Sequence, residues 1–165
     1  MNKYAYAVAA LAVAGVVFSA GMVVADDYYD DEEQWGAGGG GWFMYEGEDG
    51  MMYKDNFGFC LNPDNYSDSA FNLNAREMDV KVKAYQFDNM EFTYDDHNEK
   101  WTAEAWGWAY GAGLEWEFHL LVTDNGHRSM DYLWFEVTTE VDDEEVTLTW
   151  EVTGLGGGQI WVYYE

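Results

Sequence analysis

The sequence predicts an all-β fold, an antiparallel β-sandwich or jelly roll of about nine strands preceded by an N-terminal hydrophobic helix. Three observations support this prediction. Several short segments alternate apolar and polar residues, which is the pattern of a strand with one buried face. Clusters of Asp, Asn, Glu and Gly separate these segments and are typical of turns. Aromatic residues make up 19% of the chain, a content too high for a disordered acidic segment.

Residues 1–25 have the features of an export signal or a membrane anchor. Lys3 is the only charged residue before Asp26, and Ala25 offers the small side chain that a signal peptidase needs at its cleavage site. An uncharged apolar run of about 20 residues also suffices to cross a bilayer as a helix, so a cleaved signal and a retained anchor both stay open. Either one exports the rest of the chain, which indicates an extracellular or cell-surface location.

The next segment, residues 26–40, combines a run of acidic residues with a run of glycines. Acidic residues repel one another and glycines bring no side chain to a core, so we expect a flexible acidic spacer here. The folded domain is then expected over residues 41–165, as one β-sandwich.

The strands of this domain follow from the alternating segments. The clearest alternation occurs at 79–84, 114–122, 133–138 and 146–153, and weaker alternation at 42–46, 51–60, 90–94, 101–110 and 158–164. The longest irregular connection is expected at 61–78, with one turn of helix. The side chains expected to face inward are Trp116, Phe118, Leu120, Leu133, Phe135, Val146, Leu148 and Trp150.

The net charge of −25 excludes several partners. Nucleic acids and anionic lipids are repelled by such a polyanion, so membrane contact is expected only through the N-terminal segment if it is not cleaved. Acids crowd at 95–99 and 142–145, where we expect like-charge repulsion to raise carboxylate pKa values. The only cysteine, Cys60, excludes a disulfide within the chain and is expected to be a small buried hydrophobe.

Several short motifs occur together in a fixed order. They include Gly39-Gly40-Gly41-Trp42, Asn56-Phe57-Gly58-Phe59, Val80-Lys81-Val82-Lys83, Trp116-Glu117-Phe118, Val122-Thr123-Asp124-Asn125-Gly126, Asp131-Tyr132-Leu133-Trp134-Phe135-Glu136-Val137 and Gly156-Gly157-Gly158-Gln159-Ile160. In this order they resemble the post-COAP domain, a β-rich module of extracellular and surface proteins. The resemblance covers residues 39–165 and implies no catalytic motif. This chain differs from the family in its many tryptophans and its acidity.

The aromatic residues of segment 101–110 are the first candidate site. Trp106, Trp108 and Tyr110 alternate with small residues, so the rings share one face of a strand. Large rings usually pack into a core, which is the first expectation. In the alternative, the small residues face inward and the three rings form an outward strip that binds a sugar or a partner protein.

Two acidic groups are the other candidates. Glu115, Glu117 and His119 share one strand face at steps of about 6.8 Å, a pattern that fits an exposed acidic face, a divalent metal site or a retaining glycosidase pair. Asp124, Asn125 and Asp131 flank one loop. Their oxygens suit calcium, although Asp124-Asn125-Gly126 is also explained as a turn.

These patterns point to a binding or structural module rather than an enzyme. No nucleophile elbow or phosphate-binding motif occurs in the sequence, and no cofactor is expected apart from calcium. The leading hypothesis is an exported, acidic, non-catalytic module of the cell surface with a structural or adhesive role, whose partner is a surface protein or a glycan. The alternative is a carbohydrate-binding module that uses the aromatic strand, and a third hypothesis is a secreted glycoside hydrolase.

Overall fold

The computed structural model describes residues 34–46, 50–76, 80–126 and 131–164. These residues belong to one compact unit, Gln34–Glu165. The expected signal or anchor at 1–25 and the charged part of the expected spacer lie outside the described residues. In the ranges that the structure describes, no helix has the length and apolar character needed to span a membrane.

The described part of the chain confirms the all-β class and the antiparallel strands. Nine strands and one short 3-10 turn make up the elements of this part. They are β1 (Trp35–Glu46), β2 (Met52–Leu61), η2 (Tyr66–Asp68), β3 (Ala70–Ala75), β4 (Val80–Asp95), β5 (Lys100–Gly111), β6 (Leu114–Asp124), β7 (Tyr132–Val141), β8 (Glu144–Thr153) and β9 (Gly157–Tyr164).

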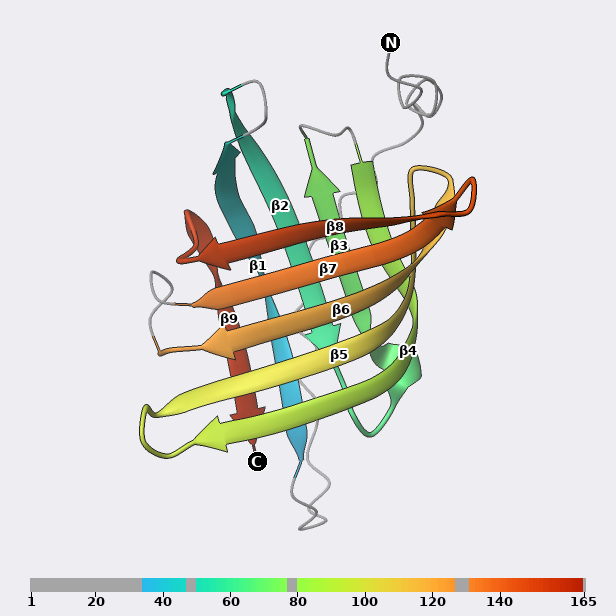
Figure 1. Cartoon of the computed structure of the whole chain (residues 1–165). Helices are drawn as coiled ribbons and strands as arrows, with labels where there is room; N and C mark the ends of the chain where they lie inside the picture. Colours follow the sequence, from blue (N-terminus) through green and yellow to red (C-terminus); the bar gives the residue numbers. More distant parts are fainter. Residues whose placement is uncertain (1–33, 47–49, 77–79, 127–130, 165) are drawn as a thin grey trace. The chain divides into compact units, whose positions relative to one another are not determined.

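The strands form one hydrogen-bonded sheet rather than the two separate sheets of the expected sandwich or jelly roll. The order across the sheet is β8-β7-β6-β5-β4-β3-β2-β1-β9. Consecutive strands therefore pair as neighbours from β1 to β8, and only β9 returns to the far side of the sheet. The sheet curls on itself, so that β5–β8 cross over β1–β3 and β9 (Figure 1). Local hairpin pairing replaces the long crossovers of a jelly roll.

Strand β4 makes the corner between the two layers. Its first residues, Val80–Lys83, pair with β3, and the remainder to Asp95 pairs with β5. The register shifts twice along this second pairing, between Ala84 and Gln86 and again between Phe87 and Asn89. Such irregularities bend a strand and increase its twist, which lets one strand serve both layers.

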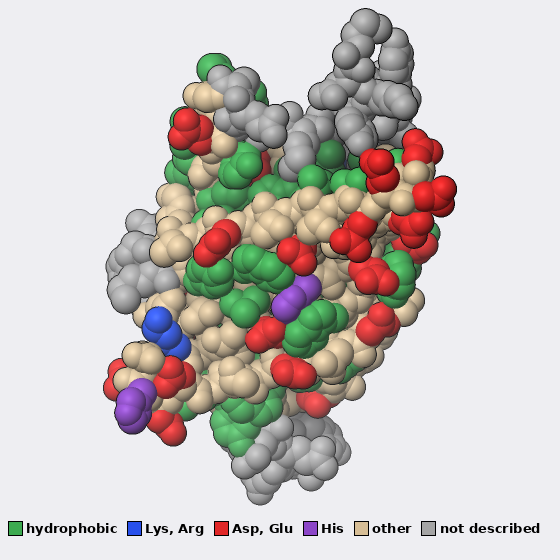
Figure 2. Space-filling view, in the orientation of Figure 1, with side chains coloured by type: hydrophobic (Ala, Val, Ile, Leu, Met, Phe, Trp, Pro, Cys, Tyr) green, Lys and Arg blue, Asp and Glu red, His purple; other side chains and the backbone are tan. Residues whose placement is uncertain are grey.

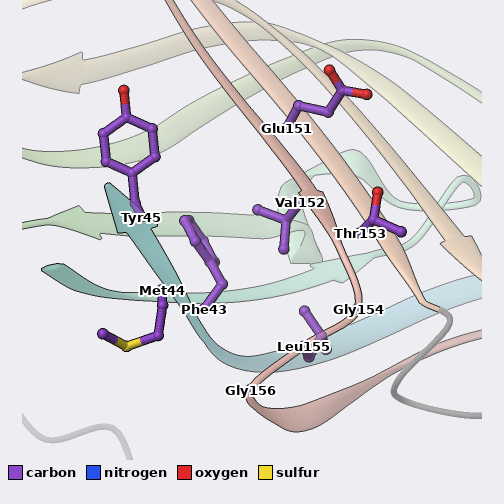
Figure 3. Close-up of a pocket in the computed structure, with 9 residues that line it drawn as sticks. All are labelled: Phe43, Met44, Tyr45, Glu151, Val152, Thr153, Gly154, Leu155 and Gly156. Atoms are coloured by element: carbon purple, nitrogen blue, oxygen red, sulfur yellow. The ribbon is translucent and has the colours of Figure 1, made fainter. Parts of the chain in front are cut away.

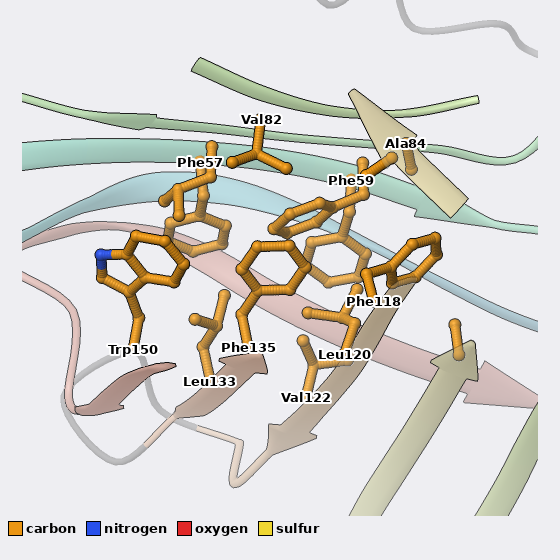
Figure 4. Packing of buried hydrophobic residues seen from close by; sticks show 14 of the residues in the cluster. Phe57, Phe59, Val82, Ala84, Phe118, Leu120, Val122, Leu133, Phe135 and Trp150 are labelled. Carbon is orange, nitrogen blue, oxygen red and sulfur yellow. The ribbon is translucent and has the colours of Figure 1, made fainter. Parts of the chain in front are cut away.

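The core lies between these layers (Figure 4). Phe71 of β3 meets Phe135 of β7 with ring centroids 4.2 Å apart, and Phe87 of β4 meets Phe118 of β6 edge to face at 5.4 Å. Of the eight side chains predicted to face inward, six are buried. The other two, Val146 and Leu148, are half-buried and pack against the core, because β8 lies at the edge of the sheet and has only β7 beside it among the described strands.

The glycine-rich stretch is a strand and not a spacer. Strand β1 begins at Trp35, within the expected spacer, and pairs with β2 on one side and β9 on the other. A Cβ atom at Gly38 would lie 2.8 Å from the indole of Trp161, so the absence of a side chain lets this ring lie across the backbone. Large rings over strand glycines replace the packing that glycine lacks. The domain boundary therefore moves back from 41 to at least 35.

Segment 61–78 was only partly predicted. The expected helical turn is present as the 3-10 turn Tyr66–Asp68, but Ala70–Ala75 forms strand β3, which the sequence analysis missed. Cys60 is exposed, contrary to the expected burial. Alternation along β2 explains this result, because its neighbours Phe59 and Leu61 both face the core.

Candidate functional site

The rings of strand β5 face outward, so the expectation that they pack into the core was wrong, and the outward direction is the one that the alternative gave them. Ala103, Ala105 and Ala109 are fully buried, whereas Trp106 and Trp108 are half-buried on the opposite face. Small residues face inward because the core here is already filled from β4 and β6. At Gly107, a Cβ atom would collide with the backbone carbonyl of Gln86 at the bulge in β4.

These rings belong to a larger outward surface, which we call the aromatic face. Figure 2 views the side of the domain on which the outer surfaces of β5–β8 lie, and it shows apolar side chains and a histidine among acidic ones. The outward residues of β5, β6 and β7 that define the face are Glu104, Trp106, Trp108, Tyr110, Glu115, Glu117, His119, Leu121, Trp134 and Glu136.

His119 lies at the centre of the aromatic face. Its imidazole stacks on the indole of Trp106 at a centroid distance of 4.6 Å and meets Trp134 edge-on at 4.8 Å. Its Nε2 lies 3.0 Å from Oε2 of Glu104, with both side chains about 30% exposed. The carboxylate and the two indoles fix the orientation of the imidazole. The stacking covers one side of the Trp106 ring.

Polar side chains flank the tryptophans along the sheet. The register places Asn89 of β4 beside Trp106 and Gln86 beside Trp108. On the other side, Glu117 of β6 is the partner of Trp108. Apolar rings between amides and carboxylates combine a stacking surface with hydrogen-bonding groups, which is the composition of a site for polar ring-shaped ligands.

The carboxylates considered for catalysis have different surroundings. The Tyr85 hydroxyl donates to Oε1 of Glu115, and Tyr85 stacks on Tyr110 at 4.6 Å. This hydrogen bond to the carboxylate raises the pKa of Tyr85 above its ordinary value. Glu117 is exposed. Glu115 therefore accepts a hydrogen bond from a tyrosine. The side chains that position His119 are instead Glu104, through a hydrogen bond, and Trp106, through stacking.

Sequence reasoning missed several members of the aromatic face. Trp134 lies between Leu133 and Phe135, which were both predicted to face inward. Its outward direction therefore followed from the alternation of the strand. Glu104 precedes Trp106 by two residues and therefore lies on the same strand face, but this position alone predicts no role for it. The pairing of Glu104 with His119 depends on the register between β5 and β6, which the alternation of one strand does not contain.

The predicted calcium residues Asp124, Asn125 and Asp131 lie together where β6 ends and β7 begins. Asp131 is buried, and its two carboxylate oxygens accept hydrogen bonds from Asn125 N at 3.3 Å and Ile160 N at 3.1 Å. Those of Asp124 accept from Gly126 N at 2.8 Å and Val162 N at 3.3 Å. Each carboxylate oxygen thus accepts a hydrogen bond from a backbone amide, and two of these amides belong to the edge strand β9.

This arrangement, which we call the β9 clasp, favours a structural role for both aspartates. A sheet edge has unpaired backbone groups that need partners, and here the carboxylates supply them at Ile160 and Val162. The described residues contain no group of three or more His, Cys, Asp or Glu side chains arranged to hold a metal ion. Calcium at this loop stays a prediction that the experiments below address.

A pocket of about 330 Å³ lies away from the aromatic face, between the end of β1 and the end of β8 (Figure 3). Its apolar side chains include Phe43, Val152 and Leu155, while Met44 and Tyr45 line it from β1. Neither Glu115 nor Glu117 lines this pocket, so the pocket does not provide a substrate cavity beside the two carboxylates considered for hydrolysis.

Comparison of the chain with protein-family models, with curated proteins and with solved structures finds no match. The chemistry of the aromatic face is therefore the basis for a proposed function.

Proposed function

We propose that this chain is an exported, acidic, non-catalytic module of the cell surface with an adhesive role, and that its aromatic face binds a carbohydrate. The observation that carries the proposal is the outward direction of Trp106 and Trp108, with Trp134 and amide and carboxylate side chains beside them. Aromatic rings interact with the apolar faces of sugars, amides donate and accept hydrogen bonds with sugar hydroxyl groups, and carboxylates accept hydrogen bonds from them.

Export is the part of the proposal that rests on sequence alone. The apolar segment 1–25 and the resemblance to the post-COAP domain both support an extracellular or surface location. Mass spectrometry of the native N-terminus in fractionated cells tests it. A chain that begins at Asp26 outside the cell indicates a cleaved signal, and a chain that begins at Met1 in the membrane fraction indicates an anchor. A folded chain in the cytoplasm would contradict export.

Glycan binding is tested with an array and then by calorimetry on the glycans that bind. Trp106→Ala and Trp108→Ala are each expected to weaken binding by about tenfold, because each removes one ring contact. Trp161→Ala is the matched control, since it removes an indole that is 47% exposed on strand β9; because this ring also covers Gly38, circular dichroism first confirms that the variant is folded. Equal losses in all three variants, or no bound glycan at all, would contradict the proposed role of the aromatic face.

A secreted glycoside hydrolase is the competing class, and the same glycans distinguish it. Hydrolysis of a bound glycan by the wild-type protein, abolished in Glu117→Gln, would replace the adhesive proposal by a catalytic one. Unchanged glycans after prolonged incubation are the result that the adhesive proposal expects.

A further inference from the structure

The two edges of the sheet differ. At the β9 edge, the amides of Ile160 and Val162 donate to the carboxylates of the β9 clasp. At the opposite edge, β8 pairs with β7, and the described residues contain no strand that pairs with its other side. An edge strand of 10 residues is a template on which a further strand can pair.

The backbone groups at the outer edge of β8 follow from the hairpin that precedes it. Asp142 and Asp143 both have positive φ angles, as in a two-residue turn of type I′. Gly154 N donates to Asp131 O across the same pair of strands at 2.8 Å. Since the direction of the amide alternates along a strand, even-numbered residues of β8 bond to β7. The amides and carbonyls of Thr147, Thr149 and Glu151 therefore point to the outer edge.

The core is also less covered along this edge. Val146 and Leu148 face inward on β8 but are half-buried, whereas Leu133 and Phe135 on the neighbouring strand are fully buried. An additional strand with apolar residues on its inner face would cover Val146 and Leu148.

The pocket lies at one end of the same edge. Glu151, Val152 and Thr153 line it from β8, and Met44 and Tyr45 line it from β1. Met44 is 48% exposed and Tyr45 is 38% exposed. An apolar side chain at the end of an added strand has a site of matching chemistry here.

Charge decides what kind of strand fits. Strand β8 contains three glutamates and no basic residue, and its hairpin adds two aspartates. A second copy of this chain would bring acids against acids, whereas a lysine- or arginine-bearing segment would be attracted. We propose that the outer edge of β8 binds an extended basic segment of a partner protein as an additional antiparallel strand, with an apolar residue of that segment in the pocket.

The probe is a synthetic peptide as long as β8, 10 residues, with phenylalanine first and then alternating lysine and valine. Antiparallel pairing places its first residue near the pocket. A scrambled peptide of the same composition has the same charge but no alternation, and it is expected to bind about tenfold more weakly. A third peptide has N-methyl groups on the amides that would face β8, and about tenfold weaker binding is expected for it too.

The matched variants are Thr147→Pro and Thr147→Val. Proline at this position removes an N–H that points away from β7, which an edge strand tolerates, and valine keeps the N–H. We expect Thr147→Pro to bind the alternating peptide about tenfold more weakly than Thr147→Val. If Thr147→Pro does not fold, the N-methylated peptide with the wild-type protein tests the same hydrogen bonds.

Hydrogen exchange gives the direct measurement. On peptide binding, the amides of Thr147, Thr149 and Glu151 are expected to become protected while those of the aromatic face are unchanged. Equal binding of the scrambled peptide would reduce the interaction to non-specific charge attraction and overturn the proposal. Protection of these amides in the free protein, together with a dimeric mass in light scattering, would identify a second copy as the occupant and also overturn it.

Discussion

The β9 clasp makes a sharp prediction about stability. Asp131→Ala removes the acceptors of two backbone amides, those of Asn125 and the buried Ile160. A buried donor without a partner costs about 1–3 kcal/mol. The Asn125 amide is only partly buried and can bond to water, so its contribution lies at the low end of that range. The free energy of unfolding is therefore expected to fall by about 2–4 kcal/mol.

Asp131→Asn keeps one acceptor oxygen and should lose about half as much. The charge control is Asp96→Ala, which removes the same charge from an exposed turn residue and should change stability by less than about 0.5 kcal/mol.

Equilibrium unfolding in denaturant measures these differences, and hydrogen exchange locates them. The Ile160 amide should exchange faster in Asp131→Ala, while amides in the centre of the sheet keep their protection. If Asp131→Ala and Asp96→Ala are equally stable, the aspartate does not hold the edge strand. A rise in melting temperature that calcium alone causes, and that Asp131→Ala abolishes, would instead restore the metal-site interpretation.

Three further predictions concern the core and the charges. Phe118→Ala should lower the free energy of unfolding by about 3–5 kcal/mol in denaturant titrations, because the side chain is only 3% exposed; a loss below about 1 kcal/mol would show that its ring is not part of the core. The melting temperature should rise with sodium chloride, because salt screens the repulsion of a chain with net charge −25, and a value that stays flat up to molar salt would contradict this. Asn98→Ala should raise the pKa of Asp95 in an NMR titration, because the Asn98 side chain and then the His97 amide hold that pKa below its ordinary value. The contribution of these hydrogen bonds to stability is present above the unfolded-state pKa of Asp95 and is lost as the pH falls through the lowered value.

The fold class and most of the strands were predictable because alternation is a local signal. Trp116, Phe118 and Leu120 face inward as predicted, since successive residues of a strand point to opposite sides. Strand β1 was missed at its start because glycine has no hydropathy to alternate. It forms a strand because β2 and β9 pair with it and Trp161 covers Gly38. That pairing is a long-range contact, and no local pattern specifies it.

The direction of the β5 rings shows a second limit of prediction from local sequence patterns. Alternation places Trp106 and Ala105 on opposite faces but does not say which face is inside. The usual preference of large rings for a core gave the wrong answer, because the inner volume is taken by Phe87 and Phe118 from the neighbouring strands. A bulge in β4 also brings its backbone against Gly107. Packing volume, which depends on the whole sheet, decided the orientation.

The pKa and the structural role of a carboxylate in this chain depend on the hydrogen-bond donors around it. Composition alone does not reveal where those donors lie. The sequence led us to expect raised carboxylate pKa values in the crowded turn 95–99, yet the pKa of Asp95 is lowered because hydrogen bonds from Asn98 and His97 stabilise its charge. Asp124 and Asp131 likewise accept from backbone amides and hold the β9 edge. At the opposite edge, Glu151 of β8 accepts a hydrogen bond from the Tyr132 hydroxyl, and the backbone amides of Thr147 and Thr149 point outward. Among the described residues, the Ile160 and Val162 amides at one edge are thus paired with carboxylates, while the β8 edge combines outward-pointing backbone groups with negative charge. This difference favours a basic strand as the partner of β8.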